Sequence, residues 1–217
     1  MSVEEAKTIP TDEHVLICGA TGTGKSYLAE HYLACYDYVV KLDTKDETDE
    51  RLRKGLSPWY GLKEGEDFTI VRSIDELDEV DTDKIIYVPP YEEQNEETFN
   101  AFFSWIFARE NTIVWIDELM SIGTANKCPR ELGRLYQQGR SKNIGIWACS
   151  QRPSGIPLIC TANSKHFFAF NLYLKQDRKR LVEATGMEEF DSLPQGYNFY
   201  YYKMGGSHAI KAILVED

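Results

Sequence analysis

One stretch of this sequence decides its fold: Gly19-Ala-Thr-Gly-Thr-Gly-Lys-Ser26. It matches the G-x-x-x-x-G-K-[ST] pattern of phosphate-binding loops at every specified position. The apolar run Val15–Cys18 predicts a buried strand directly before it, and residues 26–33 carry apolar side chains at helical spacing after it. A chain of this length matches the pattern by chance in roughly 1 case in 100, and the flanking strand and helix lower that figure. The stretch therefore predicts a nucleotide-binding site.

The chemistry of a bound triphosphate explains the residue types in this loop. Glycines let successive backbone N–H groups turn toward the β- and γ-phosphates, and the following helix adds the partial positive charge of its N-terminus. Lys25 supplies a full positive charge, and the hydroxyl of Ser26 is suited to bind Mg²⁺. We therefore expect ATP and Mg²⁺ as cofactors. The loop residues expected to contact them are Gly19, Ala20, Thr21, Gly22, Thr23, Gly24, Lys25 and Ser26.

Composition places the chain among globular proteins of one domain. Its 217 residues are 42% hydrophobic and 27% charged, enough for a continuous core. No apolar run reaches the roughly 20 residues of a membrane helix, and the acidic start of the chain is unlike a signal peptide. The formal net charge of −11 argues against a broadly basic surface that binds nucleic acid, so any DNA contact must come from local basic loops. Five cysteines, odd in number and without C-x-x-C spacing, favour a reducing compartment over disulfides or a structural zinc.

Alternating strand and helix patterns run along the chain and predict an α/β fold. Strands are expected at residues 15–18, 38–42, 68–71, 85–88, 112–116, 144–149 and 167–170, and helices at residues 26–33, 74–80, 96–109, 129–141 and 176–184. The aromatic residues of 96–109 are expected in the core, and Gly205-Gly206 between two strand-like runs predicts a C-terminal β-hairpin. The expected architecture is a mainly parallel sheet flanked by helices. It forms a single domain over residues 1–217, with an N-terminal extension at 1–12 and an irregular insertion at 44–67.

Polar residues end two of the predicted strands, where ligands bind in open α/β sheets. Asp117 closes the apolar run 112–116 like a Walker B aspartate, placed to hold Mg²⁺ near Ser26. The side chain of Glu118 diverges from that of Asp117, so it can accept a hydrogen bond from the water that attacks the γ-phosphate. Gln151 ends the next strand, where its amide can hydrogen-bond that water or the γ-phosphate. A solvated pair of acids and an ordinary turn residue are the plainer alternatives.

Arg140 lies shortly before the strand that ends in Gln151. A guanidinium held at a subunit edge can reach the γ-phosphate of a neighbouring subunit, as an arginine finger does. Physical reasoning alone favours a simpler role, a solvent-facing arginine that stabilises the end of helix 129–141 through its dipole.

Residues 139–153 resemble a stretch of the FtsK/HerA superfamily of ring-forming DNA translocases. Their sequence, Gly139-Arg-Ser-Lys-Asn-Ile-Gly-Ile-Trp-Ala-Cys-Ser-Gln-Arg-Pro153, matches the pattern G-R-x-x-x-[IL]-G-[IL]-x(4)-Q-R-P. Together with the phosphate-binding loop and Asp117-Glu118, the similarity spans residues 13–153. Small size and the absence of appended domains make the chain most similar to the genome-packaging ATPases of double-stranded DNA viruses, the branch that includes those of vaccinia and the internal-membrane phages.

The resemblance implies a RecA-like P-loop fold of the ASCE type, and a role for each matching residue. Those roles are phosphate and Mg²⁺ binding by Lys25 and Ser26, organisation of the metal by Asp117, activation of water by Glu118, and sensing by Gln151. Arg140 matches the arginine that serves as a trans finger in several relatives, with Arg152 as the alternative.

The leading interpretation is a molecular motor that uses ATP to move duplex DNA through a homo-oligomeric ring, a pentamer or hexamer, into a preformed capsid. The expected partners are double-stranded DNA and the capsid vertex or portal protein. The expected location is the host cytoplasm and the packaging vertex of the virion. The segment 119–130 leaves the Walker B strand and carries Lys127 and Arg130, so it is the candidate pore loop for DNA phosphates. A plain surface loop is an equal alternative.

Three other functions fit parts of the pattern. A cellular-type translocase or a virion-extrusion ATPase keeps the fold and changes the substrate. A small-molecule P-loop kinase would need an acceptor pocket and an arginine-rich lid helix, and no such run follows Gln151. A nucleotide-dependent structural switch is less favoured because Glu118 beside Asp117 indicates turnover.

Overall fold

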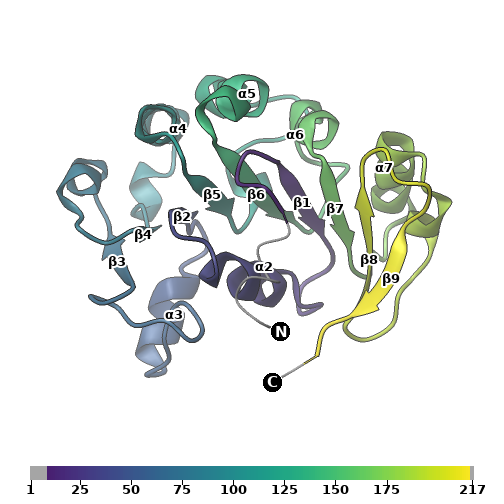
Figure 1. The fold of residues 1–217 in the computed structure, drawn as a ribbon, viewed down its shortest axis with the longest axis horizontal. Coiled ribbons are helices and arrows are strands. Elements are labelled where there is room, and N and C mark those ends of the chain that lie inside the picture. Colours follow the sequence, from purple (N-terminus) through teal and green to yellow (C-terminus); the bar gives the residue numbers. More distant parts are fainter. Residues whose placement is uncertain (1–8, 216–217) are drawn as a thin grey trace.

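The computed structural model of the chain describes residues 9–215 and shows one sheet with helices on both of its faces (Figure 1). The strands are β1 (Val15–Cys18), β2 (Val39–Leu42), β3 (Phe68–Val71), β4 (Lys84–Tyr87), β5 (Ile113–Ile116), β6 (Gly145–Ser150), β7 (His166–Ala169), β8 (Asn198–Lys203) and β9 (Ile210–Ile213). The α-helices are α2 (Lys25–Ala34), α3 (Glu47–Arg53), α4 (Glu96–Arg109), α5 (Arg130–Gln138), α6 (Leu158–Asn163) and α7 (Lys175–Thr185). Among the described residues, no helix is both long enough and apolar enough to cross a membrane.

The strand order places the phosphate-binding strand near the middle of the sheet. Within residues 9–215 the sheet has nine strands in the order β3-β4-β2-β5-β6-β1-β7-β8-β9. All pairs from β3 to β7 are parallel, and β8 and β9 add an antiparallel hairpin. The predicted α/β fold with a mainly parallel sheet and a C-terminal hairpin is therefore confirmed. Because β6 lies between β1 and β5, the residues that follow these three strands meet at one edge of the sheet, as in RecA-like folds.

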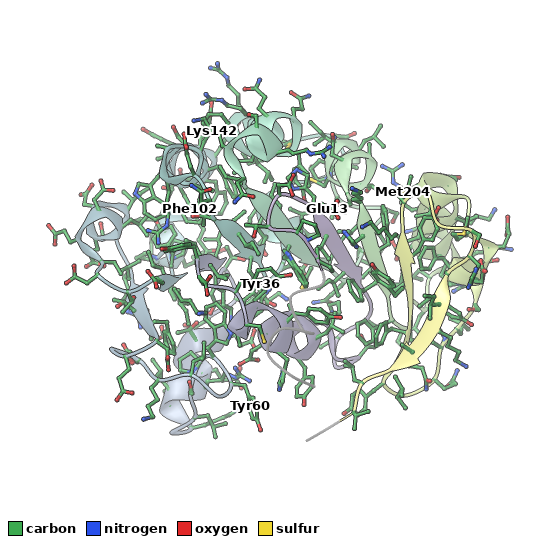
Figure 2. All side chains as sticks on the ribbon, in the orientation of Figure 1. Glu13, Tyr36, Tyr60, Phe102, Lys142 and Met204 are labelled. Atoms are coloured by element: carbon green, nitrogen blue, oxygen red, sulfur yellow. The ribbon has the colours of Figure 1, made fainter. Side chains whose placement is uncertain are left out.

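Two hydrophobic cores lie on the two faces of the sheet. Alternation along β1 sends Leu16 and Cys18 into one core, and Val15 and Ile17 into the other. Helices α4 to α7 cover the first face and α2 and α3 cover the second (Figure 1). Figure 2 shows side chains filling the space on both sides, with Phe102 of α4 in the first core and Tyr36 after α2 in the second.

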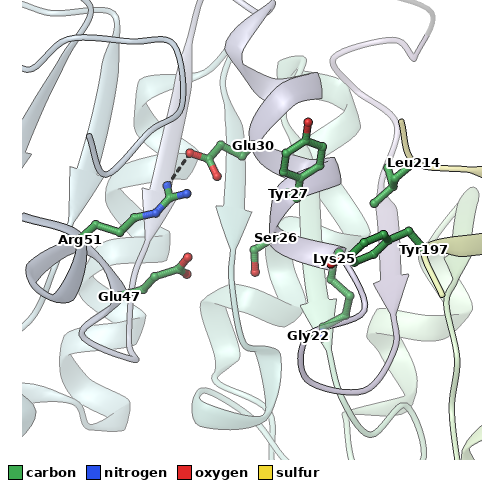
Figure 3. A pocket seen from close by; sticks show the side chains of 10 residues that line it. Gly22, Lys25, Ser26, Tyr27, Glu30, Glu47, Arg51, Tyr197 and Leu214 are labelled. Carbon is green, nitrogen blue, oxygen red and sulfur yellow. Dashed lines mark hydrogen bonds and ion pairs between the residues drawn. The ribbon is translucent and has the colours of Figure 1, made fainter. Parts of the chain in front are cut away.

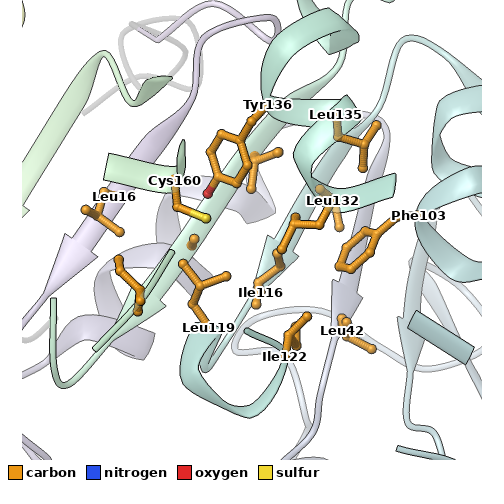
Figure 4. Packing of buried hydrophobic residues seen from close by; sticks show 14 of the residues in the cluster. Leu16, Leu42, Phe103, Ile116, Leu119, Ile122, Leu132, Leu135, Tyr136 and Cys160 are labelled. Carbon is orange, nitrogen blue, oxygen red and sulfur yellow. The ribbon is translucent and has the colours of Figure 1, made fainter. Parts of the chain in front are cut away.

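The first core depends on α4 and α5. The apolar face of α4 is buried as expected from its aromatic residues, which include Phe99, Phe102 and Phe103. Complete burial of a side chain of this size stabilises a fold by about 2 kcal/mol. Figure 4 shows Leu132 and Tyr136 of α5 lying over the strands of the same core.

The insertion expected to be irregular at residues 44–67 is partly helical, because it contains α3. Arg51 of this helix pairs with the Glu30 carboxylate of α2 at 2.5 Å. Trp59 is fully buried, and its indole N–H donates to the Glu30 carbonyl at 3.1 Å. Seven mostly charged residues carry no apolar stripe that would reveal a helix in the sequence. Tertiary contacts with α2 thus order a segment that looks irregular in its composition.

Other helices differ from the sequence-based expectation in their ends or their type, and one was not expected. The helix expected at residues 129–141 is α-helical only to Gln138 and continues as a 3-10 turn, Gly139–Lys142, and residues 74–79 form a 3-10 helix. The sequence did not predict α6, which has only six residues. Of the extension expected at residues 1–12, residues 1–8 lie outside the described part. Ile9 is buried, and its carbonyl accepts a hydrogen bond from the Tyr36 hydroxyl at 2.7 Å.

His14 joins β1 to its neighbour β6. Its Nδ1 accepts the backbone N–H of Ile146 at 3.1 Å, so this nitrogen carries no proton. Burial lowers the pKa of His14 to about 4, although a hydrogen bond with the Tyr136 backbone and the charge of Asp12 act in the opposite direction. The imidazole is therefore neutral at pH 7 and can accept this hydrogen bond.

We predict that the free energy of unfolding falls as the pH decreases from about 6.5 to 4. The unfolded chain, in which His14 has its ordinary pKa, takes up a proton before the folded chain does, and the resulting loss is about 3 kcal/mol. Urea denaturation across this pH range measures the effect. The His14→Asn protein keeps an acceptor without a titrating ring, so its stability should fall less. An equal loss in both proteins would show that His14 is not the responsible group.

Candidate active site

The phosphate-binding loop lies between β1 and α2, at the edge where the parallel strands end. Its start is held by two backbone hydrogen bonds, from Gly19 N–H to the Ser150 carbonyl at 3.2 Å and from Ala20 N–H to the Asn171 carbonyl at 2.8 Å. A Cβ at position 19 would lie 2.6 Å from the Cβ of Phe170, so a larger residue does not fit there. Gly24 has a φ of 103° at the start of α2, which only glycine adopts readily. The shape of the loop therefore depends on its glycines.

Lys25 is held inside the loop. Its Nζ donates to the Ala20 carbonyl at 2.9 Å, and its side chain is buried. Burial lowers the pKa of Lys25, and the nearby charge of Lys45 acts in the same direction, against the opposing effect of Glu118 and Asp117. A phosphate group in the loop would favour the charged form of this lysine.

Ser26 and Asp117 meet across the sheet edge, as the sequence predicted from their motifs. The Ser26 hydroxyl donates to Asp117 Oδ1 at 2.8 Å. Asp117 is 1% exposed, and its burial raises its pKa. The charges of Lys41 and Lys45 and the Ser26 hydrogen bond outweigh this effect, so the pKa of Asp117 lies below its usual value. The carboxylate is therefore ionised at neutral pH.

Lys45 is a residue of this site that the sequence did not indicate. Its Nζ lies 3.4 Å from Asp117 Oδ2 and 3.2 Å from Glu118 Oε2. Asp43, buried at the end of β2, shapes the turn that presents Lys45 by accepting the backbone N–H groups of Lys45 and Thr48 at 2.9 and 2.7 Å. Burial lowers the pKa of Lys45, but the two carboxylates raise it to above its usual value. Only the pairing of β2 with β5 brings this cation to the acidic pair.

Gln151 contacts the phosphate-binding loop directly. Its Oε1 accepts the hydroxyl of Thr21 at 2.9 Å, so the end of β6 is joined to the loop that follows β1. Arg152, in contrast, points to α7, where its Nε donates to Asp177 Oδ2 at 2.8 Å. Asp177 is buried and also accepts the N–H and hydroxyl of Ser154 at 3.1 and 2.6 Å. Arg152 is thus part of a contact between a loop and a helix.

Arg140 lies away from the loop of its own chain. It precedes β6, whereas Gln151 follows that strand, and a six-residue strand spans roughly 20 Å. Its Nε donates to Asp12 Oδ2 at 3.1 Å, and 76% of its side chain is exposed. Arg140 therefore lies at the amino-terminal ends of the parallel strands, whereas the phosphate-binding loop lies at their carboxyl-terminal ends.

Lys127 lies in the segment that links β5 to α5, and Arg130 is the first residue of α5. Lys127 forms a turn with Thr124, in which their N–H groups and carbonyls pair at 2.8 and 3.1 Å. Its ammonium pairs with Glu96 at 2.8 Å, while the Arg130 side chain is 90% exposed and lies 3.7 Å from Glu131. Both basic side chains are accessible at the surface.

A cavity of about 320 Å³ opens beside the loop and α2 (Figure 3). Lys25 and Ser26 line it near the expected phosphates, and Glu47 and Tyr197 line it from α3 and from the C-terminal hairpin. The Ser26 hydroxyl and the Asp117 carboxylate are oxygen ligands of the kind that Mg²⁺ prefers. Within residues 9–215 no group of three or more His, Cys, Asp or Glu side chains could hold a metal, so Mg²⁺ would take further ligands from phosphates and water.

The family model of the ATPase family associated with various cellular activities (AAA) matches residues 15–182. This match covers most of the chain and includes the loop, Asp117, Glu118 and Gln151. The chain therefore belongs to this family and is an ATPase. The P-loop ATPase class that the sequence predicted is thereby confirmed.

No curated protein matches the sequence significantly. Among solved structures, the chain is similar to the genome packaging NTPase of Sulfolobus turreted icosahedral virus 2 in complex with ATP-gammaS, with a TM-score of 0.73 and 16% identity over 96% of this chain and 100% of the other. The DNA-packaging ATPase of Sulfolobus turreted icosahedral virus has a TM-score of 0.71 and 17% identity over 96% and 100% of the two chains. EssC (ATPases 2 and 3) from Geobacillus thermodenitrificans has a TM-score of 0.60 and 16% identity over 91% of this chain and 38% of the other. At such identities the likeness shows a shared fold.

Proposed function

We propose that this ATPase is a motor of viral genome packaging, which hydrolyses ATP to move double-stranded DNA into a preformed capsid. The observation that carries the proposal is the extent of the match to viral packaging enzymes, because it covers nearly the whole of both chains. EssC, another similar ATPase, shares only 38% of its length with this chain. The FtsK/HerA-like segment 139–153 points in the same direction. The partners would be DNA, further copies of the chain in a ring, and the capsid vertex, in the cytoplasm of the host.

The residues at the carboxyl edge of the sheet would carry out hydrolysis. Lys25 and the loop N–H groups would hold the phosphates, and Glu118 would accept the proton of the attacking water. Gln151 would orient that water and, through its bond to Thr21, link its position to the loop. Mg²⁺ bound by Ser26 and Asp117 would neutralise phosphate charge.

The link between hydrolysis and DNA would be the segment 119–130. It begins directly after Glu118 and ends at α5, so a change at the acidic pair reaches it through few covalent bonds. Lys127 and Arg130 are accessible there, in a chain whose formal charge is −11. Such a loop can contact DNA phosphates without a broadly basic surface.

Arg140 would act on the ATP of a neighbouring subunit. Its place at the edge opposite the loop rules out contact with its own γ-phosphate, but suits a ring in which that edge faces the next subunit's nucleotide. The ion pair with Asp12 is exposed and therefore weak, so it can exchange for a phosphate partner. Arg152 is less suited because it is bound to the buried Asp177.

Steady-state hydrolysis with and without double-stranded DNA is the direct test of this function. Stimulation by DNA would support a translocase. Transfer of the γ-phosphate to a small acceptor, with no effect of DNA, would instead identify a kinase and overturn the proposal.

We predict that Lys25→Ala and Glu118→Gln fail in different ways. Lys25→Ala should lose phosphate affinity and hydrolysis together. Glu118→Gln should bind ATP normally while its turnover falls about 100-fold or more, the scale of losing a positioned base. Calorimetry and a phosphate-release assay measure the two effects. Turnover of Glu118→Gln at the wild-type rate would mean that another group activates the water.

We also predict that DNA affinity depends on Lys127 and Arg130. Replacing both by Ala should weaken binding and flatten the plot of log affinity against log salt, by about 0.9 in slope for each lost contact with duplex DNA. Lys211→Ala, in the exposed edge strand β9, removes one positive charge at another site and is the control for loss of charge alone. A slope that is equal in wild type and double variant would place the DNA site elsewhere.

If Arg140 acts on the ATP of a neighbouring subunit, as proposed, two variants that are each inactive should complement each other. Arg140→Ala should bind nucleotide normally and yet lose about 1,000-fold in rate, the scale of an arginine finger. In a mixed ring, its intact Glu118 can face the Arg140 of a neighbouring Glu118→Gln subunit. Recovery of hydrolysis on mixing would support a finger in trans. Mixed rings that are confirmed by native mass measurement but remain inactive would contradict it.

A further inference from the structure

The cavity beside the phosphate-binding loop has two arms of different chemistry (Figure 3). One arm, toward α3, is charged and is lined by Glu30, Glu47 and Arg51. The other arm, toward the C-terminal hairpin, is lined by Tyr27, Tyr197 and Leu214. We call these three residues the apolar arm.

The sheet order determines on which side of the loop the nucleoside lies. The groups suited to the γ-phosphate and its metal, Asp117 and Glu118, follow β5, on the β6 side of the loop strand β1. The hairpin β8–β9 lies on the other side of β1, beyond β7. A triphosphate whose terminal phosphate faces β5 therefore directs its nucleoside toward β8 and β9. That is the side of the apolar arm.

The hairpin is in direct contact with the loop at this point. A Cβ at Gly24 would lie 2.4 Å from Leu214 Cδ1 and 3.6 Å from Tyr197 Cδ1, so both side chains lie close to the N-cap residue of α2. The backbone N–H of Leu214 donates to the Tyr197 carbonyl at 3.1 Å, which extends the β8–β9 ladder by one pair and fixes the two side chains relative to each other. Leu214 packs against the second hydrophobic core, which includes Phe170.

Tyr27 forms the opposite wall of the apolar arm. It follows Ser26 in the first turn of α2. Its ring packs against His31 with centroids 3.9 Å apart, which limits its rotation. The charged arm offers a base less, because Arg51 and Glu30 already pair with each other at 2.5 Å.

We propose that the apolar arm is the base-binding site, in which the C-terminal β-hairpin holds the nucleobase between Tyr197 and Leu214 on one side and Tyr27 on the other. Flat aromatic and aliphatic surfaces suit the faces of a purine, and stacking contributes to affinity whatever the base carries at its edge. Among the residues that the structure describes, no amide or carboxylate side chain lines the apolar arm to read that edge. The site thus recognises purines by their stacking area and distinguishes adenine from guanine only weakly.

The experiment compares ADP with pyrophosphate, which occupies the same loop without a base or sugar. Calorimetry in the presence of Mg²⁺ should show that Tyr197→Ala and Leu214→Ala each raise the Kd of ADP about 10-fold or more, the usual effect of losing a stacking partner. The Kd of pyrophosphate should stay at the wild-type value, which also shows that the variants are folded. Neither probe is hydrolysed and neither requires DNA, so the outcome is independent of the proposed packaging function.

The neighbouring residue Ile213 provides the matched control. It lies on the same hairpin, is 59% exposed, and does not line the cavity, so Ile213→Ala should leave both Kd values unchanged. In wild type, ADP but not pyrophosphate should slow hydrogen exchange at the Leu214 amide. Equal weakening of ADP and pyrophosphate in the Tyr197 and Leu214 variants, or no weakening of ADP, would overturn the assignment.

The weak distinction between purines is tested with GDP and CDP. GDP should bind within about 10-fold of ADP, and CDP more weakly than either because its ring offers less area for stacking. A preference for ADP over GDP of about 10,000-fold, the scale of a site that hydrogen-bonds its substrate, would show that the base edge is read and would overturn recognition by stacking alone.

Discussion

The buried charge of Asp117 is the constraint on which the active site depends. An ionised carboxylate with 1% exposure is stable only when cations and hydrogen-bond donors surround it. Those partners come from different elements: the Ser26 hydroxyl from α2, the Lys45 ammonium from the turn after β2, and the charge of Lys41 from β2 itself. Ser26 is separated from Asp117 by 91 positions in the sequence. The phosphate-binding loop, the turn after β2 and the end of β5 are therefore held in place by one another.

Because strands β1 to β7 are parallel, the two ends of the strands differ in the residues that they carry. The nucleotide site lies at the edge where the parallel strands end, and Arg140 precedes β6 at the opposite edge. A ring formed by heterologous contacts would bring one edge of each subunit to the other edge of the next, so the two halves of the proposed catalytic site would meet only at the interface. The hairpin β8–β9 adds a second asymmetry. In the proposed arrangement, the hairpin would bind the base on one side of β1, and hydrolysis would take place on the other side.

The sequence predicted the secondary-structure elements whose hydrophobic pattern is visible within the element itself. It did not predict elements that are stabilised by contacts between distant segments. Continuous apolar runs such as Thr112–Ile116 indicated buried strands, and the aromatic residues of α4 indicated a core helix, because burial on a sheet requires both patterns. Helix α3 was not indicated, because its seven residues are mostly charged and it is held by the Arg51–Glu30 pair and the burial of Trp59. Helix α6 was not predicted because its six residues are too few to show the hydrophobic periodicity of a helix.

The same division applies to the site. The sequence by itself determined the phosphate-binding loop, because a backbone that turns its N–H groups toward phosphate requires glycines at fixed spacing and a lysine and hydroxyl after them. It also indicated Asp117 and Glu118, which follow an apolar strand directly. Only the tertiary structure decided that Lys45 faces both carboxylates and that Tyr197 and Leu214 cover Gly24. These contacts follow from the order of strands in the sheet, and local patterns carry no record of that order, because hydrophobic periodicity shows that a strand is buried but not which strand lies beside it.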